Sequence, residues 1–481
     1  MRQLPRFLRI VSAFGLMCLL SDPVNSAVAA DVAKWIPDDA NALVIVDADR
    51  LFNSALGQKE GWGKPKAADF AGRPVLLTPN TLRLVRAGSM NFDTMEAPSQ
   101  VALLSVRKSP TLETIAKNEK GYVESVGNTR TAWSPRGAYA VNLDTGVVGV
   151  VFPANRQYLS RWMKQRRGQA SSYLLKALTE FDTTKLCASI VFDLDDALAA
   201  GHIEHALAHL KCMADKKSDL KAIAASLESV RGVKLGITIA DKATGKLVID
   251  FNGSSASLQA IAKPLVIEVI AELGYELDDM ETWKQTSTSN SITLEGDLSR
   301  SGLMRLSSLC EAPHLALDES GRDADQADSG DPKLYATQSH YKSVQALLDD
   351  LGGKKKETFG QAGKWCEQYA QRIDRLPIVH VDDDMLKYSA NVSGMLRDMG
   401  LTMRGVGIRT ASRQADVYGS GVTYNYRGQR LITQEASATQ AAIKTQERSA
   451  GAMDARQIRQ QIDIETAAIR KVMSQRYKIE F

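Results

Sequence analysis

The sequence predicts an α+β protein: tandem units of antiparallel sheet and helix, followed by a mainly helical C-terminal segment. Two observations lead to this prediction. Turn residues such as Asp144-Thr145-Gly146 repeatedly separate short apolar runs, which is typical of β-hairpins. From residue 334 onward, apolar residues recur mainly at helical spacing. Because hairpins pair antiparallel strands, we expect antiparallel sheets with helices on one face rather than a doubly wound parallel sheet.

The first half of the chain alternates strand and helix signals. Apolar runs bounded by polar or turn residues predict strands, and helical periodicity predicts helices. The expected strands are 42–46, 100–106, 139–143, 147–152, 188–192, 233–240, 246–251, 283–287 and 291–295. The expected helices are 111–117, 156–165, 194–213, 257–273 and 299–309.

Two stretches follow a similar order and begin alike. The segment ALVIVDADRLF, from Ala42, aligns with ASIVFDLDDAL, from Ala188. A third version, IVHVDDDML, begins at Ile378. We therefore expect two copies of one α+β unit, at residues 31–168 and 182–310. We also expect three strands that end in Asp-x-Asp and continue into a helix.

The remainder of the chain differs in composition. Residues 311–333 are acidic and poor in apolar side chains, which predicts a linker. Residues 334–430 predict a helical segment, with helices at 341–351 and 361–373 and a small hairpin built from 406–410 and 417–426. Residues 431–481 predict a C-terminal helix with one apolar stripe. That stripe comprises Ile458, Ile462, Ile469 and Val472, and it must pack on the same chain or on an unknown protein partner.

The N-terminal residues predict export. Three arginines precede an apolar run of about eleven residues, and Ala27-Val28-Ala29 then gives an A-x-A cleavage site, so residues 1–29 are interpreted as a signal peptide. The run is too short to span a bilayer, and we expect no membrane span once it is removed. The mature chain would be a soluble protein of the periplasm or the cell exterior.

Charge and cysteine content exclude some classes of protein. After residues 1–29 the chain carries 57 basic and 55 acidic residues, so a nucleic-acid partner is not expected. Four cysteines remain in 452 residues, which permits two disulfides of three connectivities but leaves the fold dependent on its apolar core. They are Cys187, Cys212, Cys310 and Cys366.

Asp193 and Asp195 form the sharpest candidate for chemistry. They follow an apolar strand, and VFDLD resembles motif I of the haloacid-dehalogenase-like phosphatases. That resemblance implies that Asp193 is a nucleophile and Asp195 a general acid and base, with Mg²⁺ at the strand end. Ala197 departs from the family pattern, which has Thr or Val there. The competing interpretation is structural: aspartates between strand and helix cap backbone amides, which accounts for all three repeats.

A second candidate is a set of metal ligands. His202, His205, His209 and Cys212 would fall within about 80° of arc on one α-helix, and imidazole and thiolate are ligands for zinc or copper. One straight helix cannot surround an ion, and His205 is not part of an H-E-x-x-H motif. The competing interpretation places these histidines at the partly solvent-exposed edge of an apolar stripe, where histidine is common without a metal. We therefore expect neither a metal nor another cofactor.

Several phrases together resemble a group of exported bacterial proteins of about this length with no assigned function. They are WIPDDANA from Trp35, SPRGAY from Ser134, ITLEGDLS from Ile292 and YAQRIDRLPI from Tyr369. The resemblance implies export and α+β architecture but no site residues. We expect a non-enzymatic interaction or structural module. The alternatives are a magnesium-dependent phosphatase using Asp193 and Asp195, or a metal-binding protein using the 202–212 face.

Overall fold

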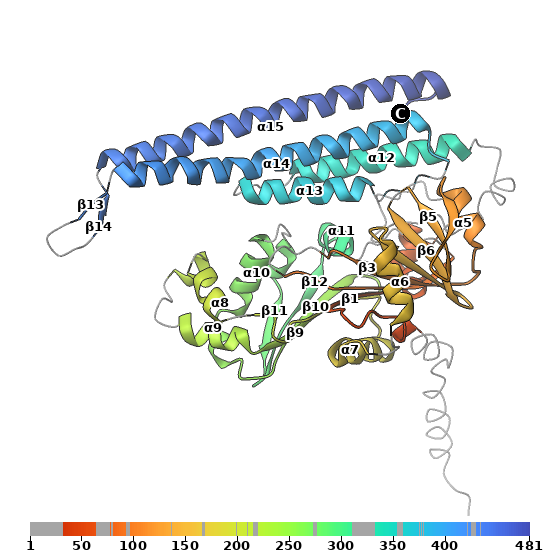
Figure 1. Cartoon of the computed structure of the whole chain (residues 1–481), viewed down its shortest axis with the longest axis horizontal. Coiled ribbons are helices and arrows are strands. Elements are labelled where there is room, and N and C mark those ends of the chain that lie inside the picture. Colours follow the sequence, from red (N-terminus) through yellow and green to blue (C-terminus); the bar gives the residue numbers. More distant parts are fainter. Residues whose placement is uncertain are drawn as a thin grey trace, which may run out of the picture.

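A computed structural model shows a large antiparallel sheet, covered by helices, beside a unit of long helices (Figure 1). No helix among the described residues combines the length and apolarity needed to cross a bilayer. The structure describes residues 32–63, 77, 80–92, 97–135, 137–165, 169–198, 200–208, 210–214, 220–272, 277–309, 332–353, 359–374, 376, 378, 380–420, 422–424, 430–432 and 434–481. The predicted signal peptide and nearly all of the predicted acidic linker lie outside these ranges.

Within the described residues, the first part of the sheet unit contains seven strands. They are β1 (Ala42–Asp47), β2 (Thr81–Gly88), β3 (Gln100–Val106), β4 (Tyr122–Val126), β5 (Thr129–Ser134), β6 (Ala138–Asp144) and β7 (Val147–Phe152). Its helices are α3 (Ala48–Asn53), α4 (Ala55–Glu60), α5 (Leu112–Asn118), α6 (Arg156–Lys164) and α7 (Ser172–Thr183). The predicted hairpin about Asp144-Thr145-Gly146 is confirmed, because β6 pairs with β7.

The described residues of the second part contribute five strands to the same sheet. They are β8 (Ala188–Asp193), β9 (Val230–Ile239), β10 (Ala243–Phe251), β11 (Lys284–Ser287) and β12 (Ser291–Leu298). Its helices are α8 (Ala200–Leu207), α9 (Leu220–Glu228), α10 (Ala262–Glu272) and α11 (Arg300–Leu309), with 3-10 turns η2 (Lys211–Met213), η3 (Ala256–Leu258) and η4 (Asp278–Glu281).

Strand order relates the two parts. From the centre outward, one side runs β1-β2-β3-β7-β6-β5-β4 and the other β8-β9-β10-β12-β11. The sides meet where β1 pairs antiparallel with β8, and Val44 lies opposite Ile190, its counterpart in the aligned segments. Each side thus starts with three consecutive strands and then inserts a later strand beside the third. On this basis we propose that residues 31–168 and 182–310 descend from one duplicated unit.

Helices cover both faces of the sheet, so the prediction of helices on one face was wrong. Alternate residues of β1 belong to different cores: Val44 and Val46 pack with residues of α3 and α5. Leu43 and Ile45 pack with residues of α6 and α7 on the other face. The physical reason is visible in the strands themselves, because β1 and β7 are apolar at nearly every position, as strands buried on both faces are.

Close packing fixes α6 against the sheet. A side chain at Gly149 would place its Cβ 2.7 Å from the ring of Trp162, so only glycine fits at that point of β7. The Trp162 indole also donates to the carbonyl of Trp35 at 2.8 Å. Helix α6 itself follows Asn155, whose side chain accepts the amide of Tyr158 as an N-cap.

The helical unit contains α12 (Pro332–Gly353), α13 (Phe359–Asp374), α14 (Asp383–Ser420) and α15 (Gln434–Tyr477). The last two run side by side past the ends of the others, and the short strands β13 (Val422–Tyr424) and β14 (Arg430–Ile432) pair at their far end (Figure 1). Residues 406–410, predicted as a strand, lie inside α14. Val406 is buried there, and packing along a long helix has overridden the strand propensity of its β-branched neighbours.

Two further expectations about Asp-x-Asp segments were wrong. Ile378, His380 and Val381 are not in a strand; His380 has a left-handed φ of 59°, which an extended run does not accommodate. After β8, Asp196 has a φ of 55°, so the chain turns and α8 begins only at Ala200 instead of at residue 194. Of the three segments, only the one at Asp47 passes from strand directly into helix.

Candidate functional site

Asp193 ends β8 and is almost completely buried, with 8% of the residue exposed. Its Oδ1 accepts the backbone amide of Asp195 at 3.2 Å and a hydrogen bond from Nη1 of Arg231. Its Oδ2 accepts from Nη2 of Arg231 at 3.1 Å and from the hydroxyl of Ser171. Both carboxylate oxygens are therefore engaged, and this one side chain connects β8, β9 and the start of α7.

Asp195 lies closer to solvent, with 53% of its side chain exposed. It pairs with Nη1 of Arg231 at 3.2 Å and accepts from the amide of Asn252 at 3.2 Å. The structure thus brings the two predicted carboxylates together around one guanidinium, which also stacks over the ring of Tyr173 at 5.2 Å. A buried carboxylate held by a bidentate arginine forms a strong structural link, whereas nucleophilic attack requires a carboxylate oxygen free to approach a substrate.

Asp47, the counterpart of Asp193, has the same kind of surroundings. Its side chain accepts the amide of Arg50 as the N-cap of α3 and pairs with Nε of Arg50 at 3.0 Å. Burial raises the pKa of the Asp47 carboxyl, although Arg50 and Arg83 oppose the shift. Arg83, on β2, is buried with Asp182 of α7 at 2.6 Å. In both halves an arginine from the neighbouring part of the sheet therefore lies near the aspartate that ends the first strand.

The proposed metal-ligand face does not lie on one helix. Helix α8 ends at Leu207, and Leu210 has an extended backbone, so Cys212 lies in the separate turn η2. That expectation of a continuous helix was wrong. The side chains of His202 and His205, and the whole of His209, lie outside the described residues. Burial and a hydrogen bond with Glu268 raise the pKa of the Cys212 thiol to about 11, which disfavours the thiolate that metals bind.

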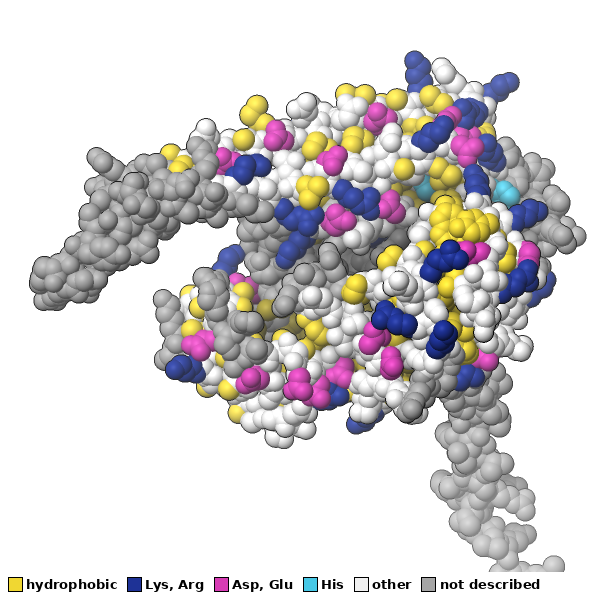
Figure 2. All heavy atoms as spheres, viewed as in Figure 1, with side chains coloured by type: hydrophobic (Ala, Val, Ile, Leu, Met, Phe, Trp, Pro, Cys, Tyr) yellow, Lys and Arg dark blue, Asp and Glu magenta, His cyan; other side chains and the backbone are white. Residues whose placement is uncertain are grey.

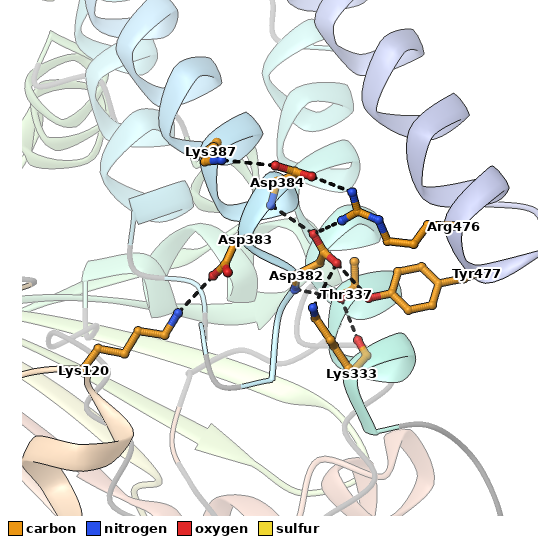
Figure 3. Close-up of polar contacts among 9 residues, drawn as sticks. All are labelled: Lys120, Lys333, Thr337, Asp382, Asp383, Asp384, Lys387, Arg476 and Tyr477. Carbon is orange, nitrogen blue, oxygen red and sulfur yellow. Dashed lines mark hydrogen bonds and ion pairs between the residues drawn. The ribbon is translucent and has the colours of Figure 1, made fainter.

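Asp382 is the centre of a polar cluster in the helical unit (Figure 3). Its side chain is 1% exposed. It accepts hydrogen bonds from Arg476 at 2.6 Å and from the hydroxyl of Tyr477 at 3.0 Å, and it pairs with Lys333 at 3.2 Å. These partners come from α15 and α12. The same carboxylate accepts the amide of Asp384 at 3.0 Å and so caps the start of α14.

The flanking aspartates extend this cluster in two directions (Figure 3). Asp384 binds the other Nη of Arg476 at 2.7 Å, so one guanidinium spans two carboxylates. Asp383 faces the opposite way and pairs with Lys120 of the sheet unit at 3.0 Å, where both side chains are more than two-thirds exposed. The Asp-Asp-Asp sequence therefore fastens three helices to one another and also contacts the sheet unit.

The Asp382 cluster predicts acid sensitivity. Burial alone would raise the pKa of Asp382, but hydrogen bonds from Arg476, the Asp384 amide and Tyr477 hold it well below its ordinary value. The Asp382 carboxyl binds a proton less readily in the folded chain than in the unfolded chain. The ionised carboxylate therefore stabilises the folded chain fully above the unfolded pKa of about 3.9, and this contribution is lost as pH falls through the folded pKa. The free energy of unfolding, followed by helical circular dichroism at a series of acidic pH values, should fall less steeply below about pH 4 in Asp382→Asn than in the unaltered chain. Equal slopes would contradict this.

A cavity of about 490 Å³ lies between the two parts of the sheet unit. Trp62, Leu298 and Leu303 give it an apolar wall, and Glu60 and Arg300 also line it and form an ion pair across it at 3.4 Å. The indole nitrogen of Trp62 is buried and donates to no described residue. The volume is that of a small-molecule pocket, but the chemistry of its lining does not select one class of ligand.

Sequence reasoning identified the aspartates but missed their partners. Arg231, Arg476 and Lys333 lie between 36 and 94 residues from the carboxylates that they bind, as the Asp195–Arg231 and Asp382–Arg476 pairs show. One signal was available: Arg231 lies two residues before the predicted strand 233–240, and a charge carried into a buried strand requires a partner.

Comparisons with known proteins leave the family open. No family model matches the chain, and no curated protein matches it. Among solved structures, one titled "Structure of crystal form I of TP0453" has a TM-score of 0.31 and 11% sequence identity. It covers 56% of this chain and 92% of its own. A TM-score this low carries no argument about fold or function.

Proposed function

We propose that this chain is an exported, non-enzymatic protein that binds another protein through the outward face of α15. The observation that carries the proposal is that face itself. Met453, Gln457, Gln460, Ile464 and Ala467 are all exposed, and they fall within about 80° of arc on the helix. Four turns of the outermost helix therefore present a face without charge, which is unusual for a solvated helix.

The predicted apolar stripe of this helix is used within the chain. Ile462 and Ile469 are buried against α12, α13 and α14, and Ile458 packs at the edge of that core. Val472 is 40% exposed. The exposed face lies about 180° from the buried one, and Met453 and Ile464 there are 68% and 60% exposed. In Figure 2, hydrophobic side chains accordingly lie on the outer edge of the helical unit, away from the sheet.

The aspartate sites support a non-enzymatic function. Asp47, Asp193 and Asp382 each cap a backbone amide and bind an arginine. Asp47 and Asp382 cap helices, whereas Asp193 holds the turn that follows β8; in each case the carboxylate has a structural partner. Export rests on the predicted signal peptide at residues 1–29.

The experiment compares capture of envelope proteins by the full mature chain and by the double variant Met453→Glu, Ile464→Glu. Binding through the altered face would bury the two introduced glutamates, which costs free energy. We therefore expect the double variant to capture about tenfold less, or lower still, of any protein that the unaltered chain captures selectively. Ala390→Glu, at an exposed position on α14, is the matched control and should capture normally. Equal capture by the double variant would contradict the proposal.

A further inference from the structure

We propose that the outward face of α15 binds the same face of a second copy of this chain, in antiparallel orientation. The inference rests on the proposed function, because it names the partner for that face. The starting point is spacing. Met453, Gln457, Gln460, Ile464 and Ala467 recur at intervals of four and three residues, which is the heptad spacing of residues at a coiled-coil seam.

Geometry leaves this face accessible to a large partner. Helix α15 is the outermost element of the helical unit, and the sheet unit lies on the opposite side of α12, α13 and α14 (Figure 1). Two copies can therefore approach along α15 without contact between their sheet units. A two-fold axis at Gln460 would bring that residue against its own copy and Met453 against Ala467 of the second copy.

Charge complementarity favours a second copy in the antiparallel orientation. The residues flanking the seam on one side include Arg456 and Asp463, both about 60–80° from its centre. Asp463 pairs with Arg459 of its own helix at 3.5 Å, but its side chain is 65% exposed, so a second guanidinium can still reach it. With the axis at Gln460, Arg456 of each copy lies beside Asp463 of the other, which gives two reciprocal ion pairs. On the other flank the nearest residues, Gln461 and Ala468, are uncharged and create no repulsion.

In a parallel pairing Arg456 would instead lie level with Arg456 of the second copy. Arg456 of one copy would then not meet Asp463 of the other, and the two reciprocal ion pairs would not form. The antiparallel arrangement also closes on itself as an isologous dimer, with no surface left for further copies. The seam contains two glutamines and an alanine, so we expect a weak, concentration-dependent dimer rather than an obligate one.

The test is sedimentation equilibrium of the full mature chain over a concentration series that reaches the high micromolar range. We expect a monomer–dimer equilibrium. Arg456→Asp alone and Asp463→Arg alone should each weaken dimerisation about threefold to tenfold, because each places like charges across the seam. The double variant Arg456→Asp, Asp463→Arg restores opposite charges and should recover most of the affinity. Circular dichroism of each variant checks that α15 remains helical.

The outcomes separate this inference from the proposed function. A chain that stays monomeric at every concentration overturns the dimer, as does a double charge-swap variant that associates no better than the single variants. If the chain is monomeric and Met453→Glu, Ile464→Glu still loses a captured protein, the face binds a different partner and only the dimer fails. If capture is also unchanged by that variant, both proposals fail.

Discussion

Replacing Asp382 with alanine is expected to destabilise the helical unit by about 3 kcal/mol. The substitution removes the cap of α14 and leaves Arg476, Lys333 and Tyr477 without the carboxylate that joins α12 and α15 to α14. Urea unfolding followed by helical circular dichroism measures the loss. A large effect is expected because the Asp382 side chain is fully enclosed while its partners carry two positive charges.

The neighbouring Asp383 gives a matched control in the same triplet. Its ion pair with Lys120 is exposed on both sides, and such pairs contribute between zero and about 1 kcal/mol. Asp383→Ala should therefore leave the urea midpoint nearly unchanged. Equal effects of the two substitutions would show that the Asp382 cluster does not hold the helices together.

Asp193→Asn is expected to cost about 2 kcal/mol of the stability of the sheet unit, because the half-buried guanidinium of Arg231 loses its bidentate partner. Asp195→Asn should cost less than about 1 kcal/mol, since that carboxylate is half exposed. Thermal unfolding followed by circular dichroism in the far and near ultraviolet compares the stabilities of the two variants.

The same pair of variants distinguishes a structural aspartate from a nucleophile. A phosphatase would lose activity in both variants whatever their stability. We expect no magnesium-dependent hydrolysis of a generic phosphate ester by the unaltered chain. Turnover that Asp193→Asn abolishes, with the fold intact, would overturn the structural interpretation and restore the phosphatase alternative.

Local patterns predicted much of the sheet. Strand β3 was predicted with both ends correct, and the turn at Asp144-Thr145-Gly146 located the β6–β7 hairpin because its chemistry is local. Strand β2 was missed because Arg83 and Arg86 interrupt its apolar run, and the burial of Arg83 depends on Asp182, 99 residues away. The covering of both faces could have been predicted from β1 and β7, whose apolar runs do not alternate.

The candidate sites were predictable only in part, for a similar reason. Asp47 and Asp382 could be recognised as helix caps from their position in the repeated segments, whereas Asp193 holds a turn instead of a helix start. Whether an aspartate also binds an arginine, however, depends on strands and helices that meet only in the folded chain. The left-handed residues Asp196 and His380 likewise redirect the backbone at points where the sequence pattern favours a continuous element.

The antiparallel pairing of β1 with β8 has a consequence for how the sheet unit unfolds. Separating the two halves there would expose the edges of β1 and β8, whose side chains are apolar on both faces of the sheet. The halves therefore lack the independence that duplicated domains joined by a tether retain. The two halves are therefore expected to unfold together in one cooperative transition. A destabilising substitution in either half should lower the stability of the whole twelve-stranded sheet.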